Sequence, residues 1–244
     1  MKKEYWIILI AYIAMQLSSL FGVPLVLLLA DLLGQKPENM QILAVAYWLV
    51  ISFTITLIIT LLLLRKEMKM GLAQRDASSA ASAVGWAIGG IFLALIAQAT
   101  AASIENMIGV EMGSENTQQI IRIIEASPVV ILISSVVGPI LEEIVFRKII
   151  FGSLHKRFNF FLSALISSVI FALAHFEPEH ILLYSAMGFT FAFLYVKTKR
   201  IIVPIFAHVA MNTLVAVIQL NQENLEKWMK EMENVQSFIS CIAV

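Results

Sequence analysis

Residues 126–153 read ASPVVILISSVVGPILEEIVFRKIIFGS, an apolar run that is interrupted by Glu142, Glu143 and Arg147. Its uncharged part, Ala126–Leu141, is shorter than the roughly 20 residues that a helix needs to cross a hydrocarbon core about 30 Å thick. The run becomes long enough only if one helix continues through the three charged residues. Those charges would then lie at membrane depth, where ionisable side chains are costly and usually face a cavity.

Six further uncharged runs accompany this stretch, and only the fifth of them is also short: Tyr5–Ala30, Asn39–Leu64, Ala77–Ile104, Phe158–Phe176, His180–Val196 and Ile201–Gln222. The composition agrees, because 59% of the 244 residues are hydrophobic and 14% are charged, against about 45–50% and about 25% in soluble domains. We therefore expect an all-α polytopic membrane protein, built as a bundle of about seven transmembrane helices.

The chain shows no internal repeat or linker that would divide it. We expect a single membrane domain over residues 1–244, with N-terminal spans without motifs in 1–127, a catalytic core in 128–220 and an exposed amphipathic tail in 221–244. The net charge is zero, so nothing indicates a nucleic-acid partner. The single cysteine, Cys241, excludes a disulfide framework and a cysteine-based metal site.

The basic residues predict an orientation. With the N-terminus in the cytoplasm, most of the 17 Lys and Arg residues gather on the cytoplasmic side, in clusters near residues 2–3, 65–75, 147–157 and 197–200. This is the distribution that the positive-inside rule describes. The other side carries most of the acids, including a predicted loop over Glu105–Glu125. We expect an integral membrane protein with a cytoplasmic N-terminus.

Polar side chains occur at membrane depth in four places: Glu142-Glu143 with Arg147, Phe171 with His175, the break Glu177-Pro178-Glu179-His180, and His208 with Asn212. Helix rise brings Glu142, His175, His208 and Asn212 to similar depths, so the bundle is expected to enclose an intramembrane catalytic cavity. The i, i+4 spacing places His208 and Asn212 on one face and favours an ion pair between Glu143 and Arg147. Glu142 is turned about 100° from Glu143 and can point elsewhere.

These side chains suffice for hydrolysis by an activated water. A free carboxylate in an apolar setting can act as a general base, and a neighbouring histidine can orient the same water. A histidine and an amide on another helix can donate to a developing oxyanion. This chemistry requires neither a nucleophilic Ser or Cys nor, strictly, a metal.

The three patterns, in this order, resemble the CPBP family, the CAAX-protease and bacteriocin-processing intramembrane peptidases. The family pattern is E-E-x-x-x-R, then F-x-x-x-H, then H-x-x-x-N or H-x-x-x-D, and this chain matches each of them between Pro128 and about Gln219. The resemblance implies an intramembrane endopeptidase of a bacterial plasma membrane. Its partners would be membrane lipid and a membrane-anchored or amphipathic peptide substrate.

The resemblance also implies roles for the residues. Glu142 and His175 would activate the water, and His208 and Asn212 would stabilise the oxyanion. Glu143 joins the catalytic candidates because it can assist the base, while Arg147 and Phe171 would support the site. No cofactor is required on this reading. Zinc held by Glu142, His175 and His208 is the alternative, which we favour less because asparagine is a poor zinc ligand.

Two readings from other classes stay open at this point. The chain could be a non-catalytic membrane transporter or a bacteriocin-immunity type binding protein, whose polar residues line a pathway. It could also carry a divalent cation with Glu177, Glu179 and His180, although the simpler interpretation is that these residues only mark the loop where the chain reverses; they could also line the substrate entrance. The sequence does not choose between prenylated proteins and bacterial peptides as the substrate.

Overall fold

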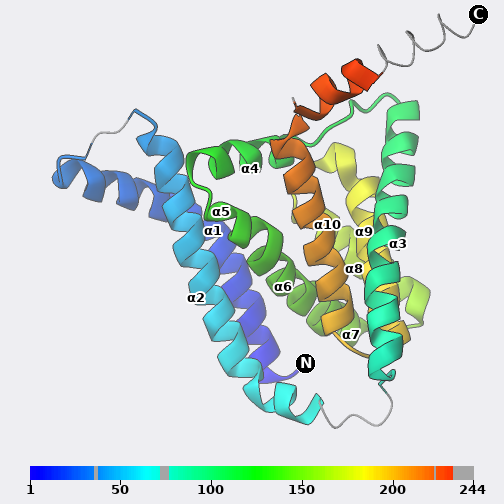
Figure 1. Ribbon diagram of the computed structural model, residues 1–244. Coiled ribbons are helices and arrows are strands. Elements are labelled where there is room, and N and C mark those ends of the chain that lie inside the picture. The colour runs from blue at the N-terminus through cyan, green and yellow to red at the C-terminus, as the bar shows by residue number, and fades with distance from the viewer. Residues whose placement is uncertain (36–37, 72–76, 223, 233–244) are drawn as a thin grey trace, which may run out of the picture.

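The computed structural model describes residues 1–35, 38–71, 77–222 and 224–232, and this part of the chain is helical apart from its loops (Figure 1). The first three helices are long: α1 (Lys3–Leu32), α2 (Met40–Gly71) and α3 (Ala80–Met107). Together with Pro178–Thr198 and Ile202–Leu220, they make five helices that are long and apolar enough to cross a membrane within the described residues. The predicted class, an all-α polytopic membrane protein, is confirmed.

The other two predicted spans, over residues 126–153 and 158–176, do not form single long α-helices. Residues 130–154 are helical throughout but change type along their length: α5 (Val130–Leu132), η1 (Ile133–Val137), α6 (Gly138–Glu142), η2 (Glu143–Phe151) and α7 (Gly152–Leu154). Both η1 and η2 are π-helical. Pro139 lacks the N–H that would bond one turn back, which removes a regular α-helical bond beside η1. The charged helix that the sequence required is therefore present, with wide turns on both sides of Glu142.

Helix α8 (Phe160–Leu173) ends earlier than the predicted span over 158–176. The backbone turns away at Phe176, which adopts a left-handed φ of 59°. The short 3-10 helix η3 (Pro178–His180) then leads directly into α9 (Ile181–Thr198), so the predicted span over 180–196 is longer than its uncharged run. Helix α10 (Ile202–Leu220) ends the bundle.

The predicted loop over Glu105–Glu125 is wrong in one respect, because it contains the helix α4 (Glu115–Ala126). Its Ser114 side chain accepts from the Thr117 N–H at the helix start, and its buried Ile124 packs with Ala46 and Val130. Charged residues are interspersed along α4, so the sequence did not reveal its apolar face. The segment is an amphipathic helix that lies across one end of the bundle (Figure 1).

The helical stretch over 130–154 is enclosed by the rest of the molecule. Figure 1 shows it between the α1–α2 pair and the group formed by α3, α8, α9 and α10. Its Leu141, Val145 and Ile149 are almost fully buried, whereas the outer faces of α1, α2 and α3 expose large apolar side chains, as expected of helices that face lipid. Residues 224–232 of the predicted tail are helical and exposed. The remainder of that tail, with Cys241, lies outside the described residues.

Candidate active site

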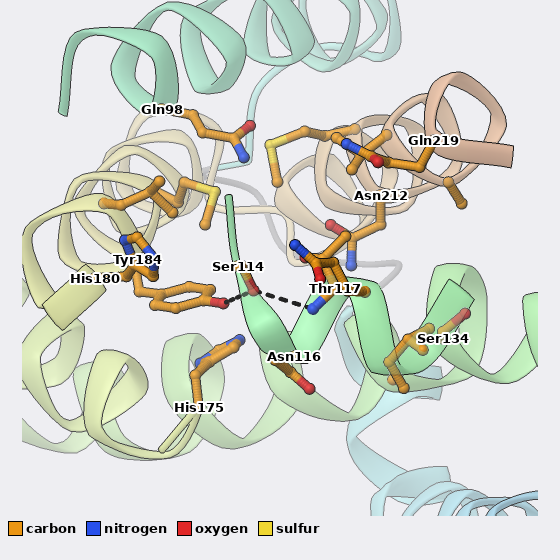
Figure 2. Close-up of a pocket in the computed structure, with 18 of the residues that line it drawn as sticks. Gln98, Ser114, Asn116, Thr117, Ser134, His175, His180, Tyr184, Asn212 and Gln219 are labelled. Atoms are coloured by element: carbon orange, nitrogen blue, oxygen red, sulfur yellow. Dashed lines mark hydrogen bonds between the residues drawn. The ribbon is translucent and has the colours of Figure 1, made fainter. Parts of the chain in front are cut away.

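A cavity of about 1250 Å³ lies between α1, α2, α3, α4, the 130–154 helix, α9 and α10. Five of the seven predicted site residues line it, namely Glu142, Phe171, His175, His208 and Asn212. Figure 2 shows His175 and Asn212 on different walls of this space, together with amide and hydroxyl side chains from α3, α4 and α10. The fold therefore brings together three patterns that are far apart in the sequence.

Glu143 and Arg147 lie behind the cavity wall, and both side chains are completely buried. The predicted ion pair is present, with Arg147 Nε 3.1 Å from Glu143 Oε2. The other oxygen of the same carboxylate, Oε1, lies 2.9 Å from Nδ1 of His208. Glu143 thus connects the arginine to the histidine and does not face the cavity.

His208 is placed between the two adjacent carboxylates. A carboxylate oxygen accepts, so the Nδ1 nitrogen of His208 carries the hydrogen that Glu143 receives. This bond turns the opposite nitrogen, Nε2, toward Glu142, whose Oε2 is 3.6 Å away. That separation is too long for a direct hydrogen bond. The ring of His208 is held flat against Phe191, with centroids 4.6 Å apart.

Aromatic rings surround the Arg147 guanidinium. Its Cζ lies 4.3 Å from the centroid of Phe171, 5.4 Å from that of Phe191 and 6.0 Å from that of Phe146. Neither Nη atom has a hydrogen-bond partner among the described residues, so the charge is balanced by Glu143 and by the faces of the rings. Phe171, expected to support the site, therefore separates the buried cation from the cavity.

His175 follows the end of α8, and a backbone bond fixes its ring. Its Nδ1 lies 2.8 Å from the Phe171 carbonyl oxygen, which can only accept, so Nδ1 carries the hydrogen. Nε2 of the neutral ring is left as an acceptor. The ring also stacks on Tyr184, with centroids 3.9 Å apart and planes 23° apart. Sequence reasoning missed Tyr184, since nothing in the sequence marks it among the aromatic residues of the spans.

Asn212 lies one turn after His208 on α10, and both line the cavity, as the i, i+4 spacing predicted. The site thus presents a carboxylate from the 130–154 helix, an acceptor nitrogen from the end of α8, and an imidazole and an amide from α10. The cavity walls thus combine a carboxylate and ring nitrogens with an amide that can donate hydrogen bonds.

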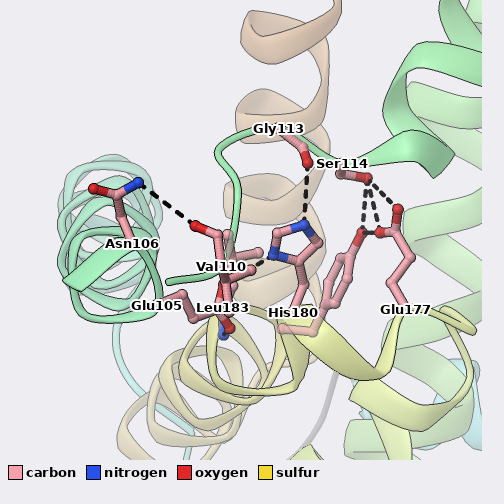
Figure 3. Close-up of polar contacts among 9 residues, drawn as sticks. Glu105, Asn106, Val110, Gly113, Ser114, Glu177, His180 and Leu183 are labelled. Carbon is pink, nitrogen blue, oxygen red and sulfur yellow. Dashed lines mark hydrogen bonds and ion pairs between the residues drawn. The ribbon is translucent and has the colours of Figure 1, made fainter. Parts of the chain in front are cut away.

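The break at residues 177–180 stabilises the α3–α4 connection (Figure 3). The Glu177 carboxylate accepts from the Ser114 hydroxyl at 2.8 Å and from the Asn116 N–H at 2.8 Å, and the Tyr184 hydroxyl donates to it as well. Burial opposes ionisation, but these hydrogen bonds hold the pKa of Glu177 below its ordinary value.

His180 makes a second set of bonds at the same connection. Its two ring nitrogens lie 2.9 Å from Glu105 Oε2 and 3.0 Å from the Gly113 carbonyl oxygen. Glu179 is exposed. Glu177 and His180 therefore have separate partners and Glu179 faces outward, an arrangement that corresponds to the loop reading and not to a shared cation site.

The zinc alternative can be tested on side-chain placement. Within the described residues, no group of three His, Cys, Asp or Glu side chains is placed to hold a metal ion. Glu142, His175 and His208 line one cavity, yet they do not converge on a point as a tetrahedral zinc site requires. The arrangement does not fit the metal.

Comparison with known proteins bears on the same region. The family model "Type II CAAX prenyl endopeptidase Rce1-like" matches residues 124–214. The chain is 50% identical over 221 residues to the membrane peptidase YdiL of Bacillus subtilis, covering 90% of this chain and 91% of that protein. It is 40% identical over 152 residues to the membrane-embedded CAAX protease MroQ of Staphylococcus aureus, covering 59% of this chain and 62% of that one. No solved structure matches the chain.

Proposed function

This chain belongs to the Rce1-like family of CAAX-type membrane proteases, and we propose that it cleaves peptide bonds within the bilayer with a water molecule activated by Glu142 and His175. The observation that carries the proposal is the placement of His208, whose two nitrogens face Glu143 and Glu142 at the wall of the cavity. Two neighbouring carboxylates thereby have different tasks around one imidazole.

The reaction begins with a water held by Glu142 and the free Nε2 of His175. Glu142 takes a proton from this water while the water oxygen attacks the peptide carbonyl carbon. The carbonyl oxygen becomes an oxyanion, which accepts hydrogen bonds from the Asn212 amide and from Nε2 of His208 in its protonated form. The carbon–nitrogen bond then breaks as the proton passes to the departing amine, which leaves a carboxylic acid and an amine.

Glu143 and Arg147 act through other residues in this scheme. The Glu143 carboxylate fixes the orientation of His208, and Arg147 balances the buried charge. A carboxylate that orients an active-site imidazole in this way determines which nitrogen reaches the substrate. Both are therefore positioning residues.

We further place the protein in the bacterial plasma membrane with a cytoplasmic N-terminus. Both relatives come from bacteria, and the basic clusters favour this orientation. The substrate would be a membrane-anchored or amphipathic peptide, because the site lies among helices that span the bilayer. Lipid contacts the outer faces of the bundle in this arrangement.

Purified wild-type protein and the Glu142→Gln variant, tested in detergent against a library of quenched fluorescent peptides, provide the direct test. Glu179→Gln is the matched control, since it makes the same change at an exposed site next to the break. We expect wild type and Glu179→Gln to cleave, and Glu142→Gln to lose at least about 100-fold in kcat, as for the removal of a general base.

Equal cleavage by Glu142→Gln would refute the proposed base. The same assay with a chelator tests the metal. Activity that is abolished by the chelator and restored by zinc would overturn the metal-free scheme and make Glu142, His175 and His208 the candidate ligands.

A further inference from the structure

The cavity has its mouth at one end of the bundle. Exposed Glu111, Gln118 and Gln222 belong to its lining, and the segments that carry them, the α3–α4 connection, α4 and the turn after α10, meet at that end (Figure 1). Asn212, the predicted oxyanion residue, lies deeper, about two turns before the end of α10. A polypeptide that reaches Asn212 from the mouth therefore passes along the wall to which α3 and α10 contribute.

This wall carries carboxamide side chains that are not bonded to the rest of the protein. Gln98 of α3 and Asn212 and Gln219 of α10 line the cavity, and Figure 2 shows all three turned toward the space between the helices. None of the three side chains has a hydrogen-bond partner among the described residues. A carboxamide has donor hydrogens and an acceptor oxygen, so each side chain is available to a ligand in the cavity.

The three amides lie at successive levels along the cavity. Helices α3 and α10 run side by side from the end that holds α7 toward the mouth (Figure 1). A Cβ added at Gly90 would lie 3.3 Å from the Cβ of Ala207, so these two residues mark the same level. At a rise of 1.5 Å per residue, Asn212 lies about 7.5 Å beyond that level, Gln98 about 12 Å and Gln219 about 18 Å. The amides thus form a row from the predicted oxyanion site to the mouth.

A polypeptide that is cleaved inside the bilayer needs such groups. A carbonyl within a helix is bonded to the N–H four residues further on, so the segment around the cleaved bond must be extended when water attacks it. Its backbone N–H and C=O groups are then unpaired, which is costly inside a bilayer. The wall beside the row consists of helices, whose own backbone groups are already bonded within each helix. Side chains must therefore supply the partners.

We propose, on the premise of the peptidase function above, that Gln98 and Gln219 bind the main chain of the substrate on the mouth side of the cleaved bond. The protein thus recognises an extended segment by its backbone. An extended chain advances about 3.3 Å per residue. Gln98 lies about 4.5 Å and Gln219 about 10.5 Å beyond Asn212 along the row, so they meet the backbone one to two residues and about three residues from the cleaved bond.

Peptides with single backbone esters test this inference. An ester lacks the amide N–H and has a weaker carbonyl acceptor, whereas every side chain stays the same. One quenched peptide with a known cleavage site is made with an ester at each nearby backbone position in turn, the cleaved bond itself excepted. We expect kcat/KM to fall about three- to tenfold, the value of one ordinary hydrogen bond, at positions within about three residues of the bond on one side. Equal rates for all esters and for the all-amide peptide would overturn the inference.

Substitution of the amides links each ester to its partner. Gln98→Met and Gln219→Met keep the length of the side chain and remove its hydrogen-bonding groups. Each variant should lose about three- to tenfold in kcat/KM on the all-amide peptide, mainly through KM, because neither residue touches the reacting atoms. Each should also become insensitive to one ester, the nearer one for Gln98→Met and the farther one for Gln219→Met, since the same hydrogen bond cannot be lost twice. Ester effects that are the same in wild type and both variants would contradict the assignment.

Gln119→Met is the matched control. Gln119 follows the cavity residue Gln118 on α4, but its own side chain is exposed and does not belong to the cavity lining. The same change there should leave kcat/KM at the wild-type value for amide and ester peptides. A loss in the control equal to the loss in Gln98→Met would show that contact with the substrate is not the cause, and it would overturn the inference.

Binding separates this inference from the peptidase proposal. Fluorescence anisotropy of the labelled peptides on Glu142→Gln, which should bind them without cleavage, reports the backbone contacts alone. Weaker binding of the sensitive esters, with the difference lost when Gln98→Met or Gln219→Met is added, supports the contacts even if wild type cleaves none of the peptides. Equal binding of amide and ester peptides refutes the contacts even if wild type cleaves all of them.

Discussion

Glu142 and Glu143 are adjacent in the chain and differ completely in their surroundings. Glu142 is partly exposed at the cavity wall, whereas Glu143 has no exposed surface and contacts both Arg147 and His208. Successive side chains of a helix point about 100° apart, so one carboxylate faces the cavity while the other faces the core. Substitutions at these two positions should therefore have different consequences.

We predict that Glu143→Gln loses both activity and stability, whereas Glu142→Gln loses activity alone. Neutralising Glu143 leaves the buried Arg147 cation without its counter-charge, and breaking a buried pair in this way costs up to about 3–5 kcal/mol. Thermal unfolding in detergent, measured alongside peptide cleavage, tests both statements. Equal unfolding midpoints for the two variants would contradict the structural role of Glu143.

Tyr184 gives a second prediction at this scale, because its ring stacks on His175 while its hydroxyl donates to Glu177. Tyr184→Phe keeps the stack and should keep most of kcat. Tyr184→Leu removes the stack, and we expect kcat to fall by about tenfold or more with a smaller change in KM, since small displacements of a reacting group are costly. Equal kcat values for the two variants would show that the stack does not position His175.

At the scale of elements, the α3–α4 connection depends on a buried carboxylate. Glu177 receives hydrogen bonds from the start of α4 and from Tyr184, and these bonds lower its pKa although burial acts in the opposite direction. A carboxyl group whose pKa is lower in the folded than in the unfolded protein stabilises the fold. This stabilisation is complete above the ordinary pKa of 4.5, and it is lost as the pH falls through the lower pKa of the folded protein.

The wild-type unfolding midpoint should therefore decrease as the pH falls from 6 to 3, and part of that decrease should be absent in Glu177→Gln. The difference between the two proteins isolates this carboxyl from the other acids, which both proteins share. Parallel pH curves for wild type and variant would show that Glu177 does not stabilise the connection through its charge.

The packing of α9 on α8 depends on Gly188. A Cβ added there would lie 3.0 Å from Cα, Cβ and Oγ of Ser168, so the backbone of one helix would have to move. We expect Gly188→Ala to destabilise the protein by about 1–3 kcal/mol, the usual cost of overpacking. Gly85→Ala is the matched control on α3, because a Cβ at Gly85 meets no atom within 4 Å. Equal stability of the two variants would refute close packing at Gly188.

The described part of the molecule has a basic end, where Lys2 and Lys148 pair with Glu67, and an opposite end, where the cavity has its mouth beside exposed Glu111 and Gln118. If the basic end faces the cytoplasm, then the mouth faces outward. We predict that a membrane-impermeant thiol reagent labels Met112→Cys but not Lys156→Cys on intact cells, with both changes made in a Cys241→Ser background. Both side chains are exposed, and the segments that carry them, the α3–α4 connection and the loop after α7, lie at opposite ends of the bundle (Figure 1). The reverse labelling would invert the orientation.

The sequence alone predicted the membrane class, the position of each long helix and the residues of the three patterns. Hydrophobic run length is a local property, and so is the i, i+4 spacing that placed Glu143 beside Arg147 and His208 beside Asn212. Every predicted span corresponds to a helical segment of the structure. The predicted and observed ends differ where the backbone conformation ends the helix, as before Phe176 with its left-handed φ. The helix α4 was missed because its charged residues favoured a loop.

Only the tertiary structure decided how these residues act on one another. The bond between His208 and Glu143 spans 65 residues of sequence, and the one between His180 and Glu105 spans 75. Such contacts follow from how helices pack, which no local pattern encodes. The same packing stacks Tyr184 on His175 and leaves the cavity wall without a lysine or arginine among the described residues. The sequence specified which side chains lie at membrane depth, and the packing of the helices determined their neighbours.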